Sequence, residues 1–201
     1  MTPWQQVLDT DGVARLGAVL SESEAGLLRT AWGELVDDLS TRSGMGRDRW
    51  LGQILQVKSP QAFHPAFAQL AENPRLHGIA RAALGTSQVR LLVHHLVWRA
   101  PQQSIALPWH QDHLTWQSVG RGPEPVVIWV ALDPADADSG ALRYAPGSHR
   151  LTTSLPEEAD PVHFPVDTGE ALIHTARTWH ASGPNRTDAW RRAAILVFAA
   201  D

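Results

Sequence analysis

Residues 88–99 read QVRLLVHHLVWR, residues 125–132 read PVVIWVAL and residues 191–199 read RRAAILVFA. Each stretch is rich in β-branched and aromatic residues and is bounded by turn-forming or charged residues, which is typical of a β-strand. Two shorter stretches, 141–145 and 171–174, follow the same pattern. Because no helical pattern lies between these five stretches, they predict an antiparallel sandwich or barrel of the jelly-roll type.

Residues 1–87 have a different character, with apolar residues at helical spacing. Ser21 and Glu24 form a capping-box pattern at the start of one predicted helix, and Asn73-Pro74 opens another. We therefore expect one mainly β domain over the whole chain, 1–201. In this domain a mainly helical layer covers the apolar outer face of a double-stranded β-helix, or cupin-like, core over 88–201.

The composition excludes several classes of protein. The 201 residues contain no cysteine, which excludes a disulfide scaffold, a cysteine zinc site, an iron–sulfur cluster and a thiol nucleophile. The net charge of −4 argues against nucleic acid as a partner. No secretory signal is apparent, and no segment approaches the roughly 18 apolar residues of a membrane span. We expect a complete, soluble, cytoplasmic protein without a membrane partner, either a monomer or a homodimer.

Histidine is the residue type that points to function, because its ten copies are about double the usual frequency. Residues 108–112, Pro-Trp-His-Gln-Asp, hold the only His-x-Asp triplet. In a strand, His110 and Asp112 would project to the same side and could bind one ion. A third ligand is then needed, and His180 is the candidate. Two histidines and one carboxylate with three open positions describe a non-haem Fe(II) oxygenase site, although the triplet alone also arises by chance.

A 2-oxoglutarate co-substrate would need a cation for its distal carboxylate, and arginine matches a carboxylate with two parallel hydrogen bonds. The last predicted strand begins with Arg191 and Arg192, which alternation assigns to opposite faces. Both faces are apolar, so the pattern alone does not say which arginine lies inside.

Four stretches of the sequence carry a resemblance to a known family. They are Trp109-His110-Gln111-Asp112, then 127–133 with the Gly-x-Leu and Pro-Gly-Ser-His hairpin of 139–149, then 169–174, and finally His180-x-Ser182-x-x-Asn185 closed by Arg191. With these stretches the chain resembles the phytanoyl-CoA dioxygenase (PhyH-like) family of Fe(II)/2-oxoglutarate-dependent dioxygenases. The resemblance covers 88–200 well and the N-terminal part loosely. One departure is Arg99-Ala100-Pro101, where many members carry Lys-x-Pro.

The resemblance implies a set of site residues and cofactors. It implies that His110, Asp112 and His180 bind Fe(II) and form the catalytic centre. It further implies that Arg191 and Ser182 hold the distal carboxylate of 2-oxoglutarate, in a pocket lined by Trp129, and that O2 is the oxidant. The resemblance thus selects Arg191, and not Arg192, as the arginine that binds the carboxylate. Turn structure for Ser182 and core packing for Trp129 are the alternatives.

The resemblance also implies the reaction, which is hydroxylation of an unactivated C–H bond of a small molecule with release of succinate and CO2. The carboxylate at Asp112 favours oxidation over halogenation, because related halogenases have a small residue there. An amino acid or an intermediate of specialised metabolism is the expected substrate. Desaturation or ring formation would use the same machinery. The alternative of another class is a cupin-like metal-binding barrel without 2-oxoglutarate turnover.

Further residues are candidates for substrate contacts or have simpler roles. The substrate candidates are His95, Arg99, Trp116, Arg143, Trp50 and Gln53. A buried hydrogen bond for His95, core packing for Trp116 and an outward charge for Arg143 are the alternatives. Five histidines have no second ligand or catalytic residue at a suitable spacing, and we expect them to be exposed or structural. They are His64, His77, His149, His163 and His174. Asn185 and the 146–148 turn are expected to be structural.

Overall fold

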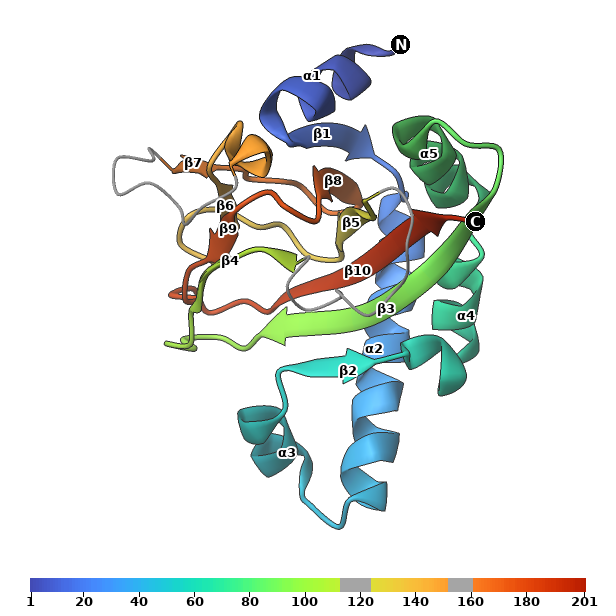
Figure 1. Ribbon diagram of the computed structural model, residues 1–201. Helices are drawn as coiled ribbons and strands as arrows, with labels where there is room; N and C mark the ends of the chain where they lie inside the picture. The colour runs from blue at the N-terminus through green and yellow to red at the C-terminus, as the bar shows by residue number, and fades with distance from the viewer. Residues whose placement is uncertain (113–123, 152–160) are drawn as a thin grey trace.

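The computed structural model describes residues 1–112, 124–151 and 161–201, and it contains two antiparallel sheets with helices packed on one of them (Figure 1). The larger sheet has the order β1-β8-β5-β10-β3-β2, and the smaller has the order β4-β9-β6-β7. The strands are β1 (Val13–Ala18), β2 (Gln56–Lys58), β3 (Val89–Arg99), β4 (Leu107–His110), β5 (Val126–Ala131), β6 (Leu142–Tyr144), β7 (Val162–His163), β8 (Glu170–Thr175), β9 (His180–Ser182) and β10 (Arg191–Ala200). The mainly β fold class with N-terminal helices is thereby confirmed.

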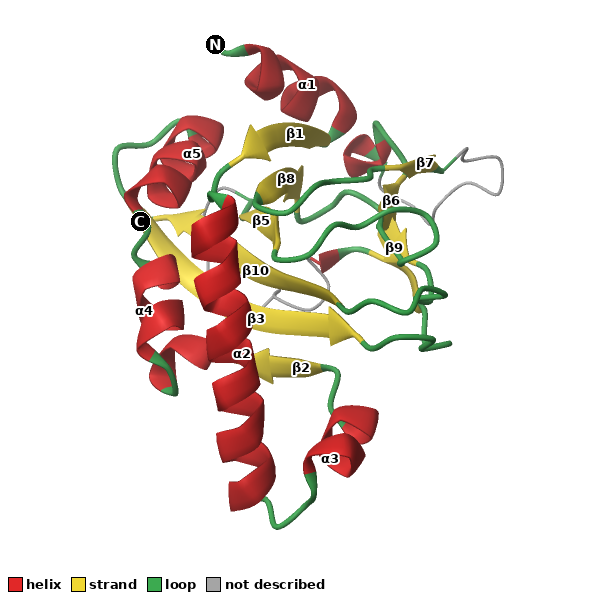
Figure 2. Cartoon of the chain, turned by 180° about the vertical axis from the view of Figure 1, so that it is seen from behind, coloured by secondary structure: helices red, strands yellow, loops and turns green. Residues whose placement is uncertain are grey.

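The α-helices of the described residues lie in the first 84 positions. The helical elements are α1 (Pro3–Asp11), α2 (Glu22–Arg42), α3 (Arg47–Gln53), η1 (Pro60–Ala62), α4 (Pro65–Ala71) and α5 (Pro74–Leu84), with η3 (Ser148–Arg150) between β6 and β7. Figure 2 shows α2 running across the back of the six-stranded sheet, with α4 and α5 beside it. The helices therefore cover the outer face of that sheet.

Local sequence signals begin and end the helices as expected. Ser21 accepts a hydrogen bond from the Glu24 amide, and the Glu24 carboxylate accepts one from the Ser21 amide, which is a complete capping box. Asn73 caps α5, and Gly85 ends it in the left-handed region at φ 64°. These caps satisfy backbone groups that the first and last turns leave unpaired.

The predicted helical layer also contains two strands, β1 and β2, which form the two edges of the six-stranded sheet. The first pairs with β8 and the second with β3. Both are short, with six and three residues, and β1 is interrupted by an irregular register between Arg15 and Gly17. Strands this short carry too little alternation to stand out from the helical pattern around them.

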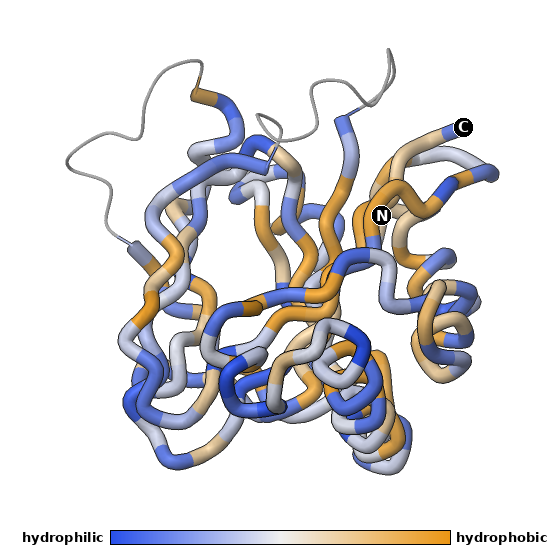
Figure 3. The backbone as a smooth tube through the Cα atoms, turned by 90° about the horizontal axis from the view of Figure 1, so that it is seen from below, coloured by the Kyte–Doolittle hydropathy of each residue, from blue (hydrophilic) through white to orange (hydrophobic). Residues whose placement is uncertain are grey.

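Alternation along the long strands divides the apolar residues between two layers. Leu96, Ala194, Leu196 and Phe198 pack with the helices, whereas Ala193 belongs to a second cluster between the two sheets. Figure 3 shows the apolar stretches concentrated on the strands, with mixed hydropathy along the helices. The space between the sheets is where the functional side chains gather. Among the described residues, no helix combines the length and hydrophobicity needed to cross a membrane.

Candidate active site

A cavity of about 340 Å³ lies between the two sheets and is lined by residues of both. The six-stranded sheet contributes side chains from β2, β3, β5, β8 and β10, and the four-stranded sheet contributes side chains from β4, β6 and β9. The predicted site residues that line it are His95, Arg99, His110, Asp112, Trp129, His180, Ser182 and Arg191. The antiparallel register places them in two groups at different positions along β9.

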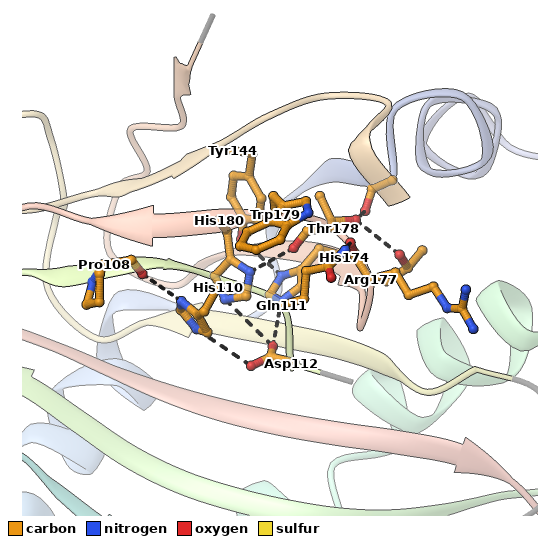
Figure 4. A network of polar contacts seen from close by, with 12 residues as sticks. Pro108, His110, Gln111, Asp112, Tyr144, His174, Arg177, Thr178, Trp179 and His180 are labelled. Carbon is orange, nitrogen blue, oxygen red and sulfur yellow. Dashed lines mark hydrogen bonds and ion pairs between the residues drawn. The ribbon is translucent and has the colours of Figure 1, made fainter. Parts of the chain in front are cut away.

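The first group is the predicted metal triad. His110 on β4 and His180 on β9 are direct cross-strand partners, so their side chains project side by side, with ring centroids 4.1 Å apart. Asp112 follows two residues after His110. One ligand atom from each of His110, Asp112 and His180 lies within 4.8 Å of the others (Figure 4). This is the only such group of three metal-ligating side chains among residues 1–112, 124–151 and 161–201.

Both histidines of the triad are oriented by their own backbone. The Nδ1–H of His110 donates to the Pro108 carbonyl at 2.9 Å, and the Nδ1–H of His180 donates to the Thr178 carbonyl at 2.9 Å. With Nδ1 protonated, a neutral ring carries its lone pair on Nε2. The two Nε2 atoms lie 3.8 and 3.7 Å from the Asp112 carboxylate oxygens, so the lone pairs converge on one place.

The charge states of these groups also suit a metal. Burial and, to a smaller extent, the neighbouring His174 lower the pKa of His180 to about 3, so His180 is neutral at pH 7. Burial would raise the pKa of Asp112, but the His174 hydrogen bond and the surrounding imidazoles hold that pKa below its usual value. A neutral imidazole at His180 and an ionised carboxylate at Asp112 are the forms of these side chains that ligate a divalent ion.

The second group lies two residues farther along β9 and is cationic. Arg191 on β10 and Arg99 on β3 are cross-strand partners on the cavity face, with exposed fractions of 2% and 7%. The Arg99 Nη2 donates to the Ser182 hydroxyl at 3.3 Å. Ser182 is itself 1% exposed and shares a strand face with His180. The two guanidiniums and the hydroxyl therefore converge beside the metal triad.

Neither guanidinium is neutralised within the described part of the chain. Arg191 and Arg99 form no ion pair there, and the Nε of each is buried without a hydrogen-bond partner. Burial and the neighbouring Arg99 charge lower the pKa of Arg191 to about 9, so it remains a cation at pH 7. A buried cation without a counter-ion is costly, and a bound anion would offset that cost.

Arg192 makes the contrast clear, because it is already paired. On the opposite face of β10, Arg192 forms two hydrogen bonds with the Asp133 carboxylate, at 2.7 and 2.8 Å. Its guanidinium carbon also lies 4.9 Å above the ring of Trp32 on α2. The structure thus decides which arginine faces the cavity, a question that strand alternation left open.

Residues 8–193 match the family model described as phytanoyl-CoA dioxygenase (PhyH). The chain belongs to the phytanoyl-CoA dioxygenase family. The predicted resemblance is therefore confirmed, and with it, at the level of the family, the enzyme class of 2-oxoglutarate-dependent dioxygenases.

Relatives and solved structures agree with this assignment. The chain is 25% identical to the ectoine dioxygenase of Nocardia farcinica, covering 94% of this chain and 74% of that protein. It is 30% identical to the dioxygenase lolE1 of Epichloe uncinata, covering 49% of this chain and only 41% of that protein. The crystal structure of EvdO2 from Micromonospora carbonacea var. aurantiaca, complexed with 2-oxoglutarate, superposes with a TM-score of 0.80 at 27% identity, covering 100% of this chain and 91% of EvdO2.

Several substrate candidates lie elsewhere in this family member. Trp50 is packed between helices and sheet, where its ring stacks on Trp98 at 5.8 Å. Gln53 is exposed at the end of α3. Arg143 points away from the cavity, because its neighbour Leu142 lines it, and it lies 5.4 Å from the Trp109 ring. Strand alternation explains this outward position of Arg143, which the sequence analysis gave as the alternative to a substrate contact. Trp116 lies outside the described residues.

Sequence reasoning missed other residues around the site. Leu55, Gln56 and Lys58, on and before β2, line the cavity, but their strand was not predicted. His174 was expected to be exposed or structural; it is buried and hydrogen-bonded, but its position beside Asp112 on the cavity wall was not foreseen. A polar residue on the buried, apolar stretch 171–174 was the signal that could have singled it out.

Proposed function

We propose that this chain is an Fe(II)- and 2-oxoglutarate-dependent oxygenase that hydroxylates an unactivated C–H bond of a small molecule, with release of succinate and CO2. The observation that carries the proposal is one cavity with two chemically distinct ends. One end holds His110, Asp112 and His180, and the other holds Arg191 without a carboxylate partner in the described part of the chain. A ligand that chelates a metal and carries a distal carboxylate matches both ends.

The triad fits Fe(II) by its donor set and by its orientation. Two imidazole nitrogens and a carboxylate are the donor set of non-haem iron oxygenases, and His110, Asp112 and His180 would hold the ion with its remaining positions toward the cavity that they line. The carbonyls of Pro108 and Thr178 fix the ring orientations before the metal arrives. Bound iron would supply the activation of O2, and the protein would supply position and the exclusion of water.

Arg191 would hold the distal carboxylate of 2-oxoglutarate through paired hydrogen bonds. We assign Arg99 and Ser182 to the same carboxylate, because the hydrogen bond between them joins Arg99 to this end of the cavity. Arg99 therefore moves from the substrate to the co-substrate group. Trp129, 2% exposed, would wall the co-substrate, and the Arg191 guanidinium lies 5.7 Å from its ring.

The remaining wall of the cavity would receive the substrate. His95 lines it beside its cross-strand partners Lys58 and Ile195, and Gln56 lies on the same strand as Lys58. Burial and the nearby Lys58 charge lower the pKa of His95, which favours a neutral imidazole able to hydrogen-bond a polar group. A volume of about 340 Å³, shared with 2-oxoglutarate, suits a small molecule such as an amino acid or a natural-product intermediate.

The test is co-substrate turnover. Under anaerobic conditions, Fe(II) and 2-oxoglutarate added together should produce the weak visible charge-transfer band of their chelate in the protein. Admission of O2 should then yield succinate, even without the natural substrate. Absence of both the band and succinate would overturn the proposal and favour a cupin-like metal-binding barrel.

A further inference from the structure

A buried hydrogen-bonded chain stands behind Asp112. His174 Nε2 lies 3.1 Å from Asp112 Oδ2, and the Tyr144 hydroxyl lies 3.0 Å from His174 Nδ1 (Figure 4). His174 is 2% exposed and Tyr144 is fully buried. The strand pairing brings them together, because Tyr144 is the cross-strand partner of His180 while His174 lies on the opposing sheet. Neither residue belongs to the triad or to the cationic group.

The chemistry of the three groups sets the direction of this chain. An ionised carboxylate only accepts hydrogen bonds, so the proton between Asp112 and His174 lies on Nε2. The other ring nitrogen, Nδ1, is then the acceptor for the Tyr144 hydroxyl. Within the described residues, the Tyr144 hydroxyl and the His174 ring make no other side-chain hydrogen bond. The donors thus point in series from Tyr144 through His174 to Asp112.

The contact at Oδ2 distinguishes the two oxygens of Asp112. Both oxygens lie at similar distances from the triad imidazoles, Oδ1 at 3.8 Å from His110 Nε2 and Oδ2 at 3.7 Å from His180 Nε2. Only Oδ2 accepts a hydrogen bond, from His174, and Oδ1 has no hydrogen-bond donor among the described residues. We propose that Tyr144 and His174 are positioning residues that hold Asp112 as a one-oxygen ligand, through Oδ1. This inference rests on the proposed iron site.

The benefit of a one-oxygen ligand follows from counting coordination positions. Six positions less two imidazoles and one carboxylate oxygen leave three, which 2-oxoglutarate and O2 together require. A carboxylate that bound through both oxygens would occupy one of these three. A hydrogen bond to Oδ2 disfavours coordination of the metal by both carboxylate oxygens. It also fixes the rotation of the carboxylate group before the metal binds.

The test uses Co(II) as a visible probe of the metal site, without 2-oxoglutarate or O2. His174→Ala removes the donor, and we expect the affinity for Co(II) to fall about 10- to 100-fold, with displaced ligand-field bands. His174→Gln keeps an N–H donor, so we expect it to recover most of the affinity and the wild-type band positions. Tyr144→Phe removes only the hydroxyl and should weaken binding about 2- to 10-fold. Equal losses in His174→Ala and His174→Gln would overturn the proposal.

His94→Ala is the matched control. His94 is 1% exposed, like His174, but it faces the ring of Phe67 on α4, and both its ring nitrogens lack hydrogen-bond partners in the described part of the chain. We expect this variant to lower the melting temperature while leaving Co(II) affinity and spectrum unchanged. A loss of affinity equal to that of His174→Ala would assign the effect to packing and overturn the proposal. Failure of the wild-type protein to bind Co(II) would instead reject the iron site itself.

Discussion

The two faces of the six-stranded sheet use the same residue types for opposite purposes. On the helix face, Trp98 packs against Trp32 and Trp50, and Arg192 is paired with Asp133. On the cavity face, Trp129 lies beside Arg191, and no carboxylate among the described residues pairs with that arginine. One face is thus closed by its own partners, and the other is incomplete without a ligand.

This difference shows how binding capacity is separated from stability within one strand. Arg191 and Arg192 are adjacent, yet the pleat sends one toward the cavity and the other toward the helices. A charge that is satisfied within the fold stabilises the fold. A charge that is buried without a partner lowers the stability of the fold, and a bound anion offsets that cost. Substitutions on the cavity face should therefore change ligand binding, and those on the helix face should change the free energy of unfolding.

The largest effect is expected at the metal end of the cavity face. Asp112→Ala removes the only carboxylate of the triad, so we expect no iron to be retained at stoichiometric Fe(II). Metal content after anaerobic gel filtration measures this, together with circular dichroism to establish that the variant is folded. Full retention of iron would remove Asp112 from the ligand set.

The helix face should respond through stability alone. Trp98 is fully buried in the aromatic cluster, so Trp98→Ala should lower the free energy of unfolding by about 3–5 kcal/mol. The folded fraction should keep the wild-type requirement for 2-oxoglutarate. Denaturant unfolding and succinate formation at low temperature check the two parts. A large change in the 2-oxoglutarate requirement would show that the two faces are coupled.

The arginine pair compares the faces within one strand. Arg191→Ala should raise the 2-oxoglutarate concentration needed for half-maximal succinate formation about 100-fold, with little change in iron affinity, because a buried charge-assisted contact is lost. Arg192→Ala is the control, since it removes the guanidinium partner of Asp133 and should cost about 3 kcal/mol of stability without changing that concentration. Equal effects of the two substitutions on the 2-oxoglutarate requirement would contradict the assignment.

The smallest effect is expected at Trp129. Trp129→Phe keeps an aromatic wall but weakens the contact with the Arg191 guanidinium, 5.7 Å away. We expect a rise of about 2- to 5-fold in the 2-oxoglutarate requirement, the size of a modest cation–π contribution. Steady-state succinate formation measures it. An unchanged requirement would leave Trp129 as core packing, the alternative considered from the sequence.

Much of the fold followed from local patterns in the sequence. The predicted strands at 88–99, 125–132 and 191–199 correspond to β3, β5 and β10 to within one or two residues. These strands are long and have strong β propensity, so their own composition identifies them. The edge strand β2, with three residues, depends on pairing with β3, and local sequence does not encode such pairing.

The sequence by itself determined the residue types of the candidate site and its membership of the phytanoyl-CoA dioxygenase family, because motifs such as His110-Gln111-Asp112 are local. Tertiary structure decided the side of β10 that faces the cavity, and it joined His174 and Tyr144 to Asp112 across two sheets. It also excluded Trp50 and Arg143 from the cavity. The physical reason is that the pleat of a strand dictates only that successive side chains alternate between its two faces. The helices packed on one face and the second sheet packed on the other decide which side chains meet which partners.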